Sequence, residues 1–196
     1  MLRDYAPLKF FRLPAATGYA QPSQVVPDRV TLDDPATNVM TDLRSVTAVI
    51  ILSGDTADEA HRRMIQRGVR LLLVVDQDRL VVGLITATDI LGEKPMQVVT
   101  QRAIRREDLL VRDIMTPQSD LEVLDIADVR AAKVGHIVAT LKRSGRQHAV
   151  VVQRESARCT VCGLFSATQI VRQLGVAIAT SELARTFAEI EAQLAR

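Results

Sequence analysis

The chain has 196 residues, of which 47% are hydrophobic, so it can form one compact unit or two small, closely packed ones. Aromatic residues make up only 3% and Trp is absent, so the core must be built from Val, Ile, Leu and Ala. The formal net charge of +2 gives no electrostatic reason to expect a nucleic acid or an anionic membrane as a partner.

Residues 1–37 are predicted to form an extended N-terminal arm. Stretches such as LPAATGYAQPSQVVP contain residues that interrupt helix and strand patterns. Charges at Asp4, Lys9 and Arg12 break up the apolar region that a signal peptide needs. No apolar run in the chain is long enough to cross a membrane. We therefore expect a cytoplasmic protein whose arm lies across its own core or across a partner.

A short frame occurs twice in the chain, as GLITATDIL at residues 83–91 and as GLFSATQIV at residues 163–171. Such self-similarity is the sequence signature of a repeated structural unit. Apolar spacing and turn residues predict the elements of the first copy. These are a helix at 57–67 that ends at Gly68, a strand at 71–75, a turn at 76–79, a strand at 80–85 and a helix from Thr86.

The second copy is predicted to have the same elements in the same order. They are a helix at 134–144 that ends at Gly145, a strand at 149–152, a turn at 153–158, a strand at 160–165 and a helix from Ser166. The stretch LEVLDIADVRAAK adds residues ahead of this helix, where we expect a strand at 122–124 and a short helical turn.

This β-α-β-β-α repeat resembles the CBS domain, the module named after cystathionine β-synthase. The resemblance rests on RGVRLLLVVD and LVVGLITATDIL in the first copy, and on VRDIMTP, SGRQHAVVV and VCGLFSATQIV in the second. It implies a mixed α/β (α+β) fold, in which two CBS repeats pack through their strands as a pseudo-two-fold pair. The expected organisation is an arm at 1–37, a first repeat at 38–95, a linker at 96–107, a second repeat at 108–178 and an amphipathic C-terminal helix at 179–196.

No catalytic constellation is found in the sequence, so we do not expect an enzyme. Cys159 and Cys162 form a lone C-T-V-C, whereas a zinc site normally needs four ligands. Cys162 takes the place of Val82 in the first copy, which indicates a small core residue. We therefore expect neither a metal site nor a required disulfide.

The repeated frame has both a structural and a functional interpretation. Structurally, Thr86 with Asp89, and Ser166 with Gln169, are acceptable capping boxes for the helices that follow. The resemblance implies in addition that the hydroxyl and the carboxylate hold the ribose of an adenosine-containing ligand between the repeats. A carboxylate accepts from both hydroxyls of a diol, whereas an amide offers one acceptor oxygen. We therefore expect one competent site at most, at Thr86 and Asp89.

The resemblance also implies the other walls of this pocket. Its implied residues are Gly68, Val69 and Leu71 beside the adenine, Arg70 and His148 at the phosphates, and Thr116 and Pro117 in the DIMTP loop. Taken alone, Arg70 is better explained as an ordinary solvated side chain, and His148 is either a second phosphate contact or a half-buried strand end. Leu73 stands where the family usually has proline, which is a departure from the pattern.

These observations predict a stand-alone tandem CBS module that acts as a regulatory sensor. Its expected ligand is AMP, ADP, ATP, S-adenosylmethionine or another adenosyl compound. The alternative is a structural oligomerisation or interaction module with an empty pocket. We expect a homodimer, and the apolar stripe of the C-terminal helix packs either on its own domain or in the subunit interface.

Overall fold

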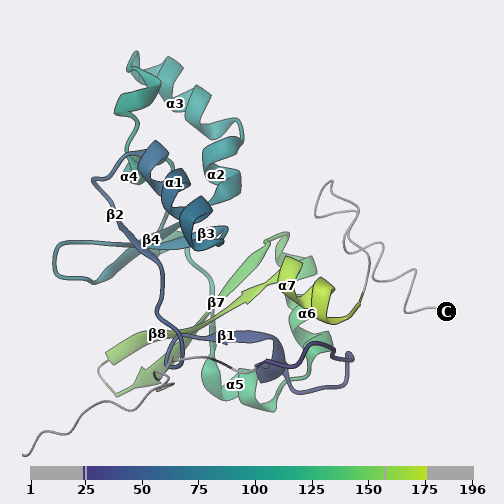
Figure 1. Ribbon diagram of the computed structural model, residues 1–196. Helices are drawn as coiled ribbons and strands as arrows, with labels where there is room; N and C mark the ends of the chain where they lie inside the picture. The colour runs from purple at the N-terminus through teal and green to yellow at the C-terminus, as the bar shows by residue number, and fades with distance from the viewer. Residues whose placement is uncertain (1–23, 25, 157, 176–196) are drawn as a thin grey trace, which may run out of the picture.

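The computed structural model describes residue 24 and residues 26–156 and 158–175 (Figure 1). The helix expected at 179–196 and most of the arm expected at 1–37 lie outside these residues. The described chain forms two four-stranded sheets. In spatial order, the first sheet contains β2 (Ile50–Leu52), β3 (Leu71–Val75), β4 (Val81–Thr86) and β5 (Thr116–Pro117). The second contains β1 (Met40–Asp42), β8 (Arg158–Ser166), β7 (His148–Glu155) and β6 (Val123–Asp125).

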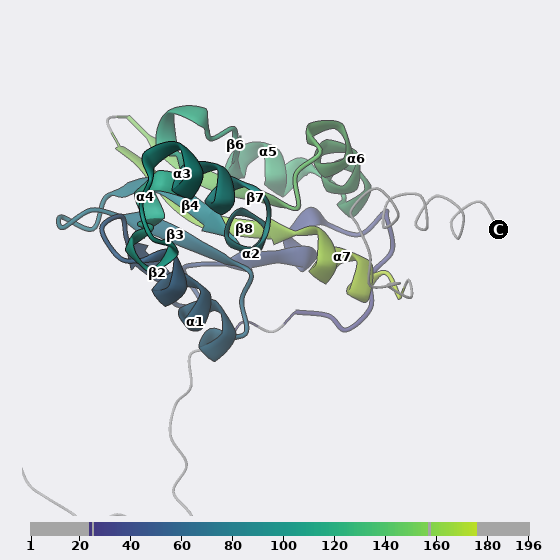
Figure 2. The same cartoon turned by 90° about the horizontal axis from the view of Figure 1, so that it is seen from above.

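Each sheet has its own group of helices, as the two views in Figures 1 and 2 show. The first group is α1 (Ala57–Arg67), α2 (Ala87–Leu91), α3 (Lys94–Arg102) and α4 (Val111–Ile114). The second group is α5 (Ile126–Ala131), α6 (Val134–Ser144) and α7 (Ala167–Gln173). Short 3-10 turns lie at η1 (Ala36–Val39), η2 (Arg106–Asp108) and η3 (Gln118–Asp120). The mixed α/β fold expected from the sequence is confirmed.

Most predicted elements are confirmed, and two regions differ. The second hairpin is longer than predicted, because residues expected in its turn, such as Gln153 and Arg154, pair with Thr160 and Cys159. These residues lie on the exposed end of the hairpin, where apolar alternation gives no signal. The stretch at 96–107, predicted only as a linker, contains most of α3 and most of η2. The extra strand and helical turn of the second copy are present as β6 and α5.

The opening strand of each copy pairs in the sheet of the other copy. β1 runs antiparallel to β8, and β5 runs antiparallel to β4. The glycine that begins each repeated frame lies against the incoming strand. A Cβ atom at Gly83 would lie 2.5 Å from the Thr116 carbonyl oxygen, and one at Gly163 would lie 2.6 Å from the Met40 sulfur. The frame therefore keeps its glycine because a strand from the other copy passes there.

The described residues have two hydrophobic cores and a third apolar layer between the sheets. One core lies between the first sheet and its helices, and includes Leu72 and Ile85. The other includes Phe165 and Cys162, which confirms that Cys162 is a small core residue. Every residue of β3 is buried, as expected for a strand covered on both faces. Its residues Leu73 and Val75 belong to neither core and line the space between the two sheets.

The described part of the arm is built into the second unit. Val30 and Ala36 are buried in its core. The carbonyl oxygens of Asp34 and Leu32 accept hydrogen bonds from Val134 N (2.8 Å) and Gly135 N (2.9 Å) at the start of α6. These N–H groups have no partner inside the helix, so the arm serves as its cap. This segment therefore lies across its own core.

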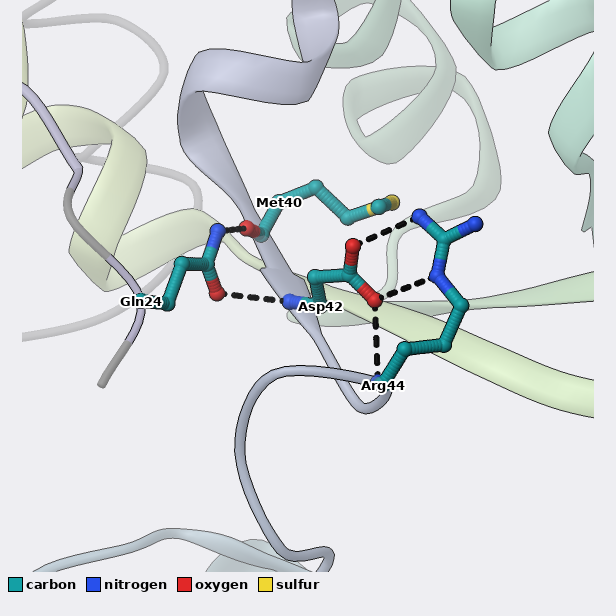
Figure 3. Close-up of polar contacts among 4 residues, drawn as sticks. All are labelled: Gln24, Met40, Asp42 and Arg44. Atoms are coloured by element: carbon teal, nitrogen blue, oxygen red, sulfur yellow. Dashed lines mark hydrogen bonds and ion pairs between the residues drawn. The ribbon is translucent and has the colours of Figure 1, made fainter. Parts of the chain in front are cut away.

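Gln24 adds a further contact between the arm and the second sheet (Figure 3). Its amide nitrogen donates to Met40 O (2.7 Å), and its amide oxygen accepts from Asp42 N (2.7 Å). One primary amide thus makes the two hydrogen bonds that the N–H and C=O of a single residue in a neighbouring strand would make. On the same strand, hydrogen bonds from the Arg44 side chain hold the pKa of Asp42 below its usual value.

Candidate functional site

The turn between β4 and α2 holds Thr86 and Asp89 in a reciprocal capping box. The Thr86 amide and hydroxyl both donate to Asp89 Oδ2, at 2.9 Å and 2.6 Å, and the Asp89 amide donates to Thr86 Oγ1 at 3.3 Å. These bonds fix the rotamer of the carboxylate at the helix start. The capping box predicted for the first copy is confirmed.

The capping box commits one oxygen of Asp89 and leaves the other available. The Oδ1 atom accepts no hydrogen bond from the described residues and lies 3.9 Å from the Lys94 ammonium. Lys94 in turn donates to the Met115 carbonyl oxygen at 3.2 Å. The Asp89 side chain keeps 20% of its surface exposed. A fixed carboxylate with a free oxygen can therefore accept hydrogen bonds from a ligand.

The second copy is not capped in this way, so the capping box predicted for Ser166 and Gln169 is wrong. Helix α7 has no side-chain hydrogen bond at its N-cap. The backbone enters the helix differently, with ψ at 122° for Ser166 and 163° for Thr86. Gln169 also differs from Asp89 in having a longer side chain with one acceptor oxygen. The two copies have therefore diverged in local structure as well as in sequence.

The first repeated frame faces a pocket of about 370 Å³ between the two copies. This volume lies at the lower end of the range of small-molecule sites. The walls come from the end of β4, the start of α2, the crossing strand β5 and the turn that follows α6. The lining residues are Arg70, Leu84, Thr86, Ala87, Thr88, Asp89, Thr116, Leu121, Gly145, Arg146, Gln147 and His148.

Two nitrogen-bearing side chains of this pocket are uncommitted. Among the described residues, neither Arg70 nor His148 has a side-chain hydrogen bond or ion pair. Arg146 is engaged, since its guanidinium donates to Asp120 O (3.3 Å) and lies 3.5 Å from the Glu122 carboxylate. The pocket thus presents a guanidinium and an imidazole that have no hydrogen bond or ion pair among the described residues, together with the carboxylate of Asp89.

Burial keeps His148 neutral at physiological pH. Desolvation, together with the positive charge of Arg70, lowers the pKa of His148 to about 4, and the charge of Asp89 opposes this shift. A neutral imidazole has one nitrogen that donates and one that accepts a hydrogen bond. His148 can therefore contact a polar ligand without adding charge.

The structure brings together only some of the predicted site residues. Arg70, Thr86, Asp89, Thr116 and His148 line the pocket, whereas four others do not. Those four are Gly68, which ends α1 at φ 63°, the half-buried Val69, the buried Leu71 and the exposed Pro117.

The sequence interpretation missed the turn at residues 145–147. This turn occupies in the second copy the place that residues 68–70 hold in the first. Ala87 N donates to Arg70 O (2.9 Å) and Ala167 N donates to Gln147 O (2.9 Å), which fixes this correspondence. The repeat alignment pointed to both turns, but it could not show which one faces Asp89.

Two negative findings apply to the described residues. No group of three or more His, Cys, Asp or Glu side chains in this part of the chain could hold a metal ion. Cys159 and Cys162 are both free thiols, one exposed and one buried. Among the helices of the same residues, none is long and apolar enough to cross a membrane.

The sequence profile of the CBS domain family matches residues 35–95. No curated protein matches the chain by sequence. An uncharacterized conserved protein from Pyrococcus horikoshii is 20% identical, with a TM-score of 0.55, and the match covers 78% of this chain and 100% of that one. CBSX2 from Arabidopsis thaliana, solved in complex with AMP, is 18% identical, with a TM-score of 0.51 and coverage of 71% and 94%.

A third solved structure is that of a conserved CBS domain protein of unknown function from Thermoplasma acidophilum. It is 16% identical to this chain, with a TM-score of 0.51, and the match covers 80% of this chain and 77% of that one. The resemblance seen in the sequence is confirmed, by the family profile for the first copy and by the fold for the pair.

The unequal caps predict unequal effects of two matched substitutions on stability. Thr86→Ala removes a side chain that caps α2, and should lower the free energy of unfolding by about 1 kcal/mol. Ser166→Ala removes a side chain that makes no cap bond, and should cost well under half of that. Urea unfolding of both variants measures the difference. Equal losses would show that the two helix starts are equivalent in solution.

His148 predicts a pH dependence of stability. Its folded pKa of about 4 lies below the ordinary 6.5, so between these values the unfolded chain binds more protons. Stability should therefore fall as pH drops from 6.5 towards 4, by on the order of 3 kcal/mol at most. His148→Gln should flatten this dependence. Urea unfolding at several pH values provides the measurement. An unchanged slope in His148→Gln would contradict the assignment.

Proposed function

We propose that this chain, which contains a CBS domain and has the fold of a CBS-domain pair, is a regulatory module that binds an adenine nucleotide between its two copies. One observation carries the proposal. Within the capping box, Asp89 keeps one oxygen that accepts no hydrogen bond from the described residues, and it lines a pocket in which Arg70 and His148 also have no hydrogen bond or ion pair among those residues. Fixed, uncommitted polar groups in a concave site are what ligand recognition requires.

The carboxylate suits the ribose end of such a ligand. A vicinal diol presents two hydroxyl donors, and Asp89 Oδ1 can accept from them without breaking the bonds that Oδ2 makes to Thr86. Because those bonds fix the side chain, little conformational freedom is lost when the ligand binds. Thr116, which reaches the pocket from the crossing strand, gives this end of the site a further polar group.

Arg70 and His148, which also line the pocket, suit an anion. Arg70 is a permanent cation with a planar fork of donors that matches phosphate oxygens. His148 adds a donor beside it, and the Lys94 ammonium lies near Asp89. This charge favours the phosphates of AMP, ADP or ATP over S-adenosylmethionine, whose sulfonium is positive. The AMP complex of CBSX2, a chain of the same fold, supports this choice.

A second candidate function is an oligomerisation module, and exposed apolar side chains favour it. Ile65 on α1, Leu91 on α2 and Met96 on α3 are 68%, 62% and 56% exposed. Large apolar side chains that remain exposed on neighbouring helices are candidates for a subunit interface. We include a homodimer in the proposal, since self-association and ligand binding are compatible. Nucleotide binding in the pocket distinguishes the two functions, because only the regulatory module requires it.

The proposal predicts that Asp89 and Gln169 differ in their effect on ligand binding. Asp89→Asn keeps the size of the side chain but removes the charge from the hydrogen bonds to the ribose. AMP affinity should fall at least about tenfold, since a charge-assisted bond contributes roughly 1.5 to 3 kcal/mol. Gln169→Asn should leave affinity unchanged, because Gln169 does not line the pocket. Calorimetric titration of both variants with AMP provides the comparison.

Two controls make this titration decisive. Adenosine should bind the wild-type chain more weakly than AMP, because it lacks the phosphate that Arg70 and His148 would contact. Thermal shifts with AMP should rise with ligand concentration, as expected for binding to the folded state. No binding of any adenosine compound would favour the oligomerisation module. Equal small effects of the two substitutions would mean that Asp89 serves only as a cap.

If the chain forms a homodimer through the exposed apolar side chains of its helices, a charge placed among them should weaken the dimer. The wild-type chain should sediment as a dimer at micromolar concentration, and Ile65→Glu should shift it towards the monomer by placing a charge among apolar contacts. Gln66→Glu, which adds the same charge at the neighbouring exposed position, is the matched control. A wild-type monomer at this concentration would contradict the prediction.

A further inference from the structure

A second hollow lies between the two sheets and is separate from the nucleotide pocket. Its volume is about 760 Å³, about twice that of the first, and well within the range of small-molecule sites. It is lined from the first sheet by Leu73, Val75 and Val81, and from the second by Val150, Val152 and Val161. We call it the inter-sheet groove. Nothing in the proposed function uses it.

The floor of the inter-sheet groove is aliphatic and buried, while its rim is exposed. Leu73, Val75, Val150 and Val152 are each at most 4% exposed. At the rim, Leu80 remains 63% exposed and could cover an apolar guest. These four floor residues have no hydrogen-bonding side chain, so they suit an alkyl chain. Asp76, Gln118 and Thr160 are the other polar residues that line the groove besides Arg79 and Cys159.

The mouth of the groove carries a cation without a partner. Arg79 lines both the groove and an adjoining hollow formed by residues 43–48. Its backbone is held in the turn by bonds of Asp76, since Arg79 N donates to Asp76 O (3.1 Å) and Leu80 N to Asp76 Oδ1 (2.8 Å). Among the described residues, the Arg79 guanidinium has no ion pair, whereas nearby Arg44 is paired with Asp42.

From this arrangement we infer that the inter-sheet groove binds a single-chain amphiphile with an anionic head group. The alkyl chain lies between the sheets on Leu73, Val75, Val150 and Val152, and the head group pairs with Arg79. The alkyl chain gains by leaving water, and the head group gains a charge-assisted bond at the rim. This inference does not rest on the proposed nucleotide site, although Leu121 lines both hollows.

Cys159 provides a local readout of occupancy. It lines the groove and its thiol is exposed, so a maleimide should alkylate it readily. The other cysteine, Cys162, is buried, and burial raises the pKa of its thiol, so it should react slowly. The rate of alkylation of the full chain therefore reports on Cys159, and a groove ligand should slow it.

The experiment titrates the full chain with saturated fatty acids from octanoate to tetradecanoate, below their micelle concentrations. Affinity should rise on the order of tenfold for each two carbons added, as expected for burial of alkyl surface. Dodecanoate at saturation should slow alkylation of Cys159. Arg79→Gln should weaken dodecanoate binding up to about fivefold, as expected for a partly exposed ion pair. Arg67→Gln removes a charge outside the groove and should leave dodecanoate binding unchanged. Dodecanol has no charged head group, so Arg79→Gln should not weaken the binding of dodecanol.

Three results would overturn the inference. Alkylation of Cys159 that is unchanged at saturating dodecanoate would place the fatty acid elsewhere. Affinity that is independent of chain length, or of Arg79, would remove the alkyl or head-group assignment. If alkylation of Cys159 becomes slower as the protein concentration rises, in the absence of fatty acid, a second copy of the chain covers the groove. Each of these results leaves AMP binding at Asp89 untouched, so the two proposals fail separately.

Discussion

The exchange of opening strands between the two copies is the constraint on which the rest of the structure depends. β1 completes the second sheet and β5 completes the first, so neither sheet is whole without a strand from the other copy. The exchange requires close approach, and Gly83 and Gly163 provide it where a side chain would meet Thr116 or Met40. The two copies therefore form one interlocked unit whose relative placement is fixed by backbone pairing.

This interlocking explains why the pocket belongs to neither copy alone. Thr86 and Asp89 come from the first copy, Thr116 arrives on the exchanged strand, and His148 belongs to the second copy. A molecule bound there contacts both copies at once. Because each sheet contains a strand from the other copy, the regulation proposed above would act through a ligand that favours one arrangement of the two units over another.

The sequence alone was sufficient for most of the elements and for the capping box of Thr86 and Asp89, because both depend on local physics. Apolar spacing located β3 and α6, and the spacing of Thr86 and Asp89 predicted a capping box. The facing wall could not be predicted, since which turn meets Asp89 depends on how the two copies pack. The absent cap at Ser166 was also out of reach, because residue type permits a cap bond but backbone direction decides it.

The amide of Gln24 on the outer edge of β1 has a consequence for solubility. β1 is the last strand of its sheet, and its edge groups at Met40 and Asp42 would otherwise be open to a strand of another molecule. Natural sheets block such edges with charges, bulges or covering loops to avoid aggregation. Here a single side chain replaces the N–H and C=O of one residue in a neighbouring strand, and so occupies the sites where edge-to-edge polymerisation would begin.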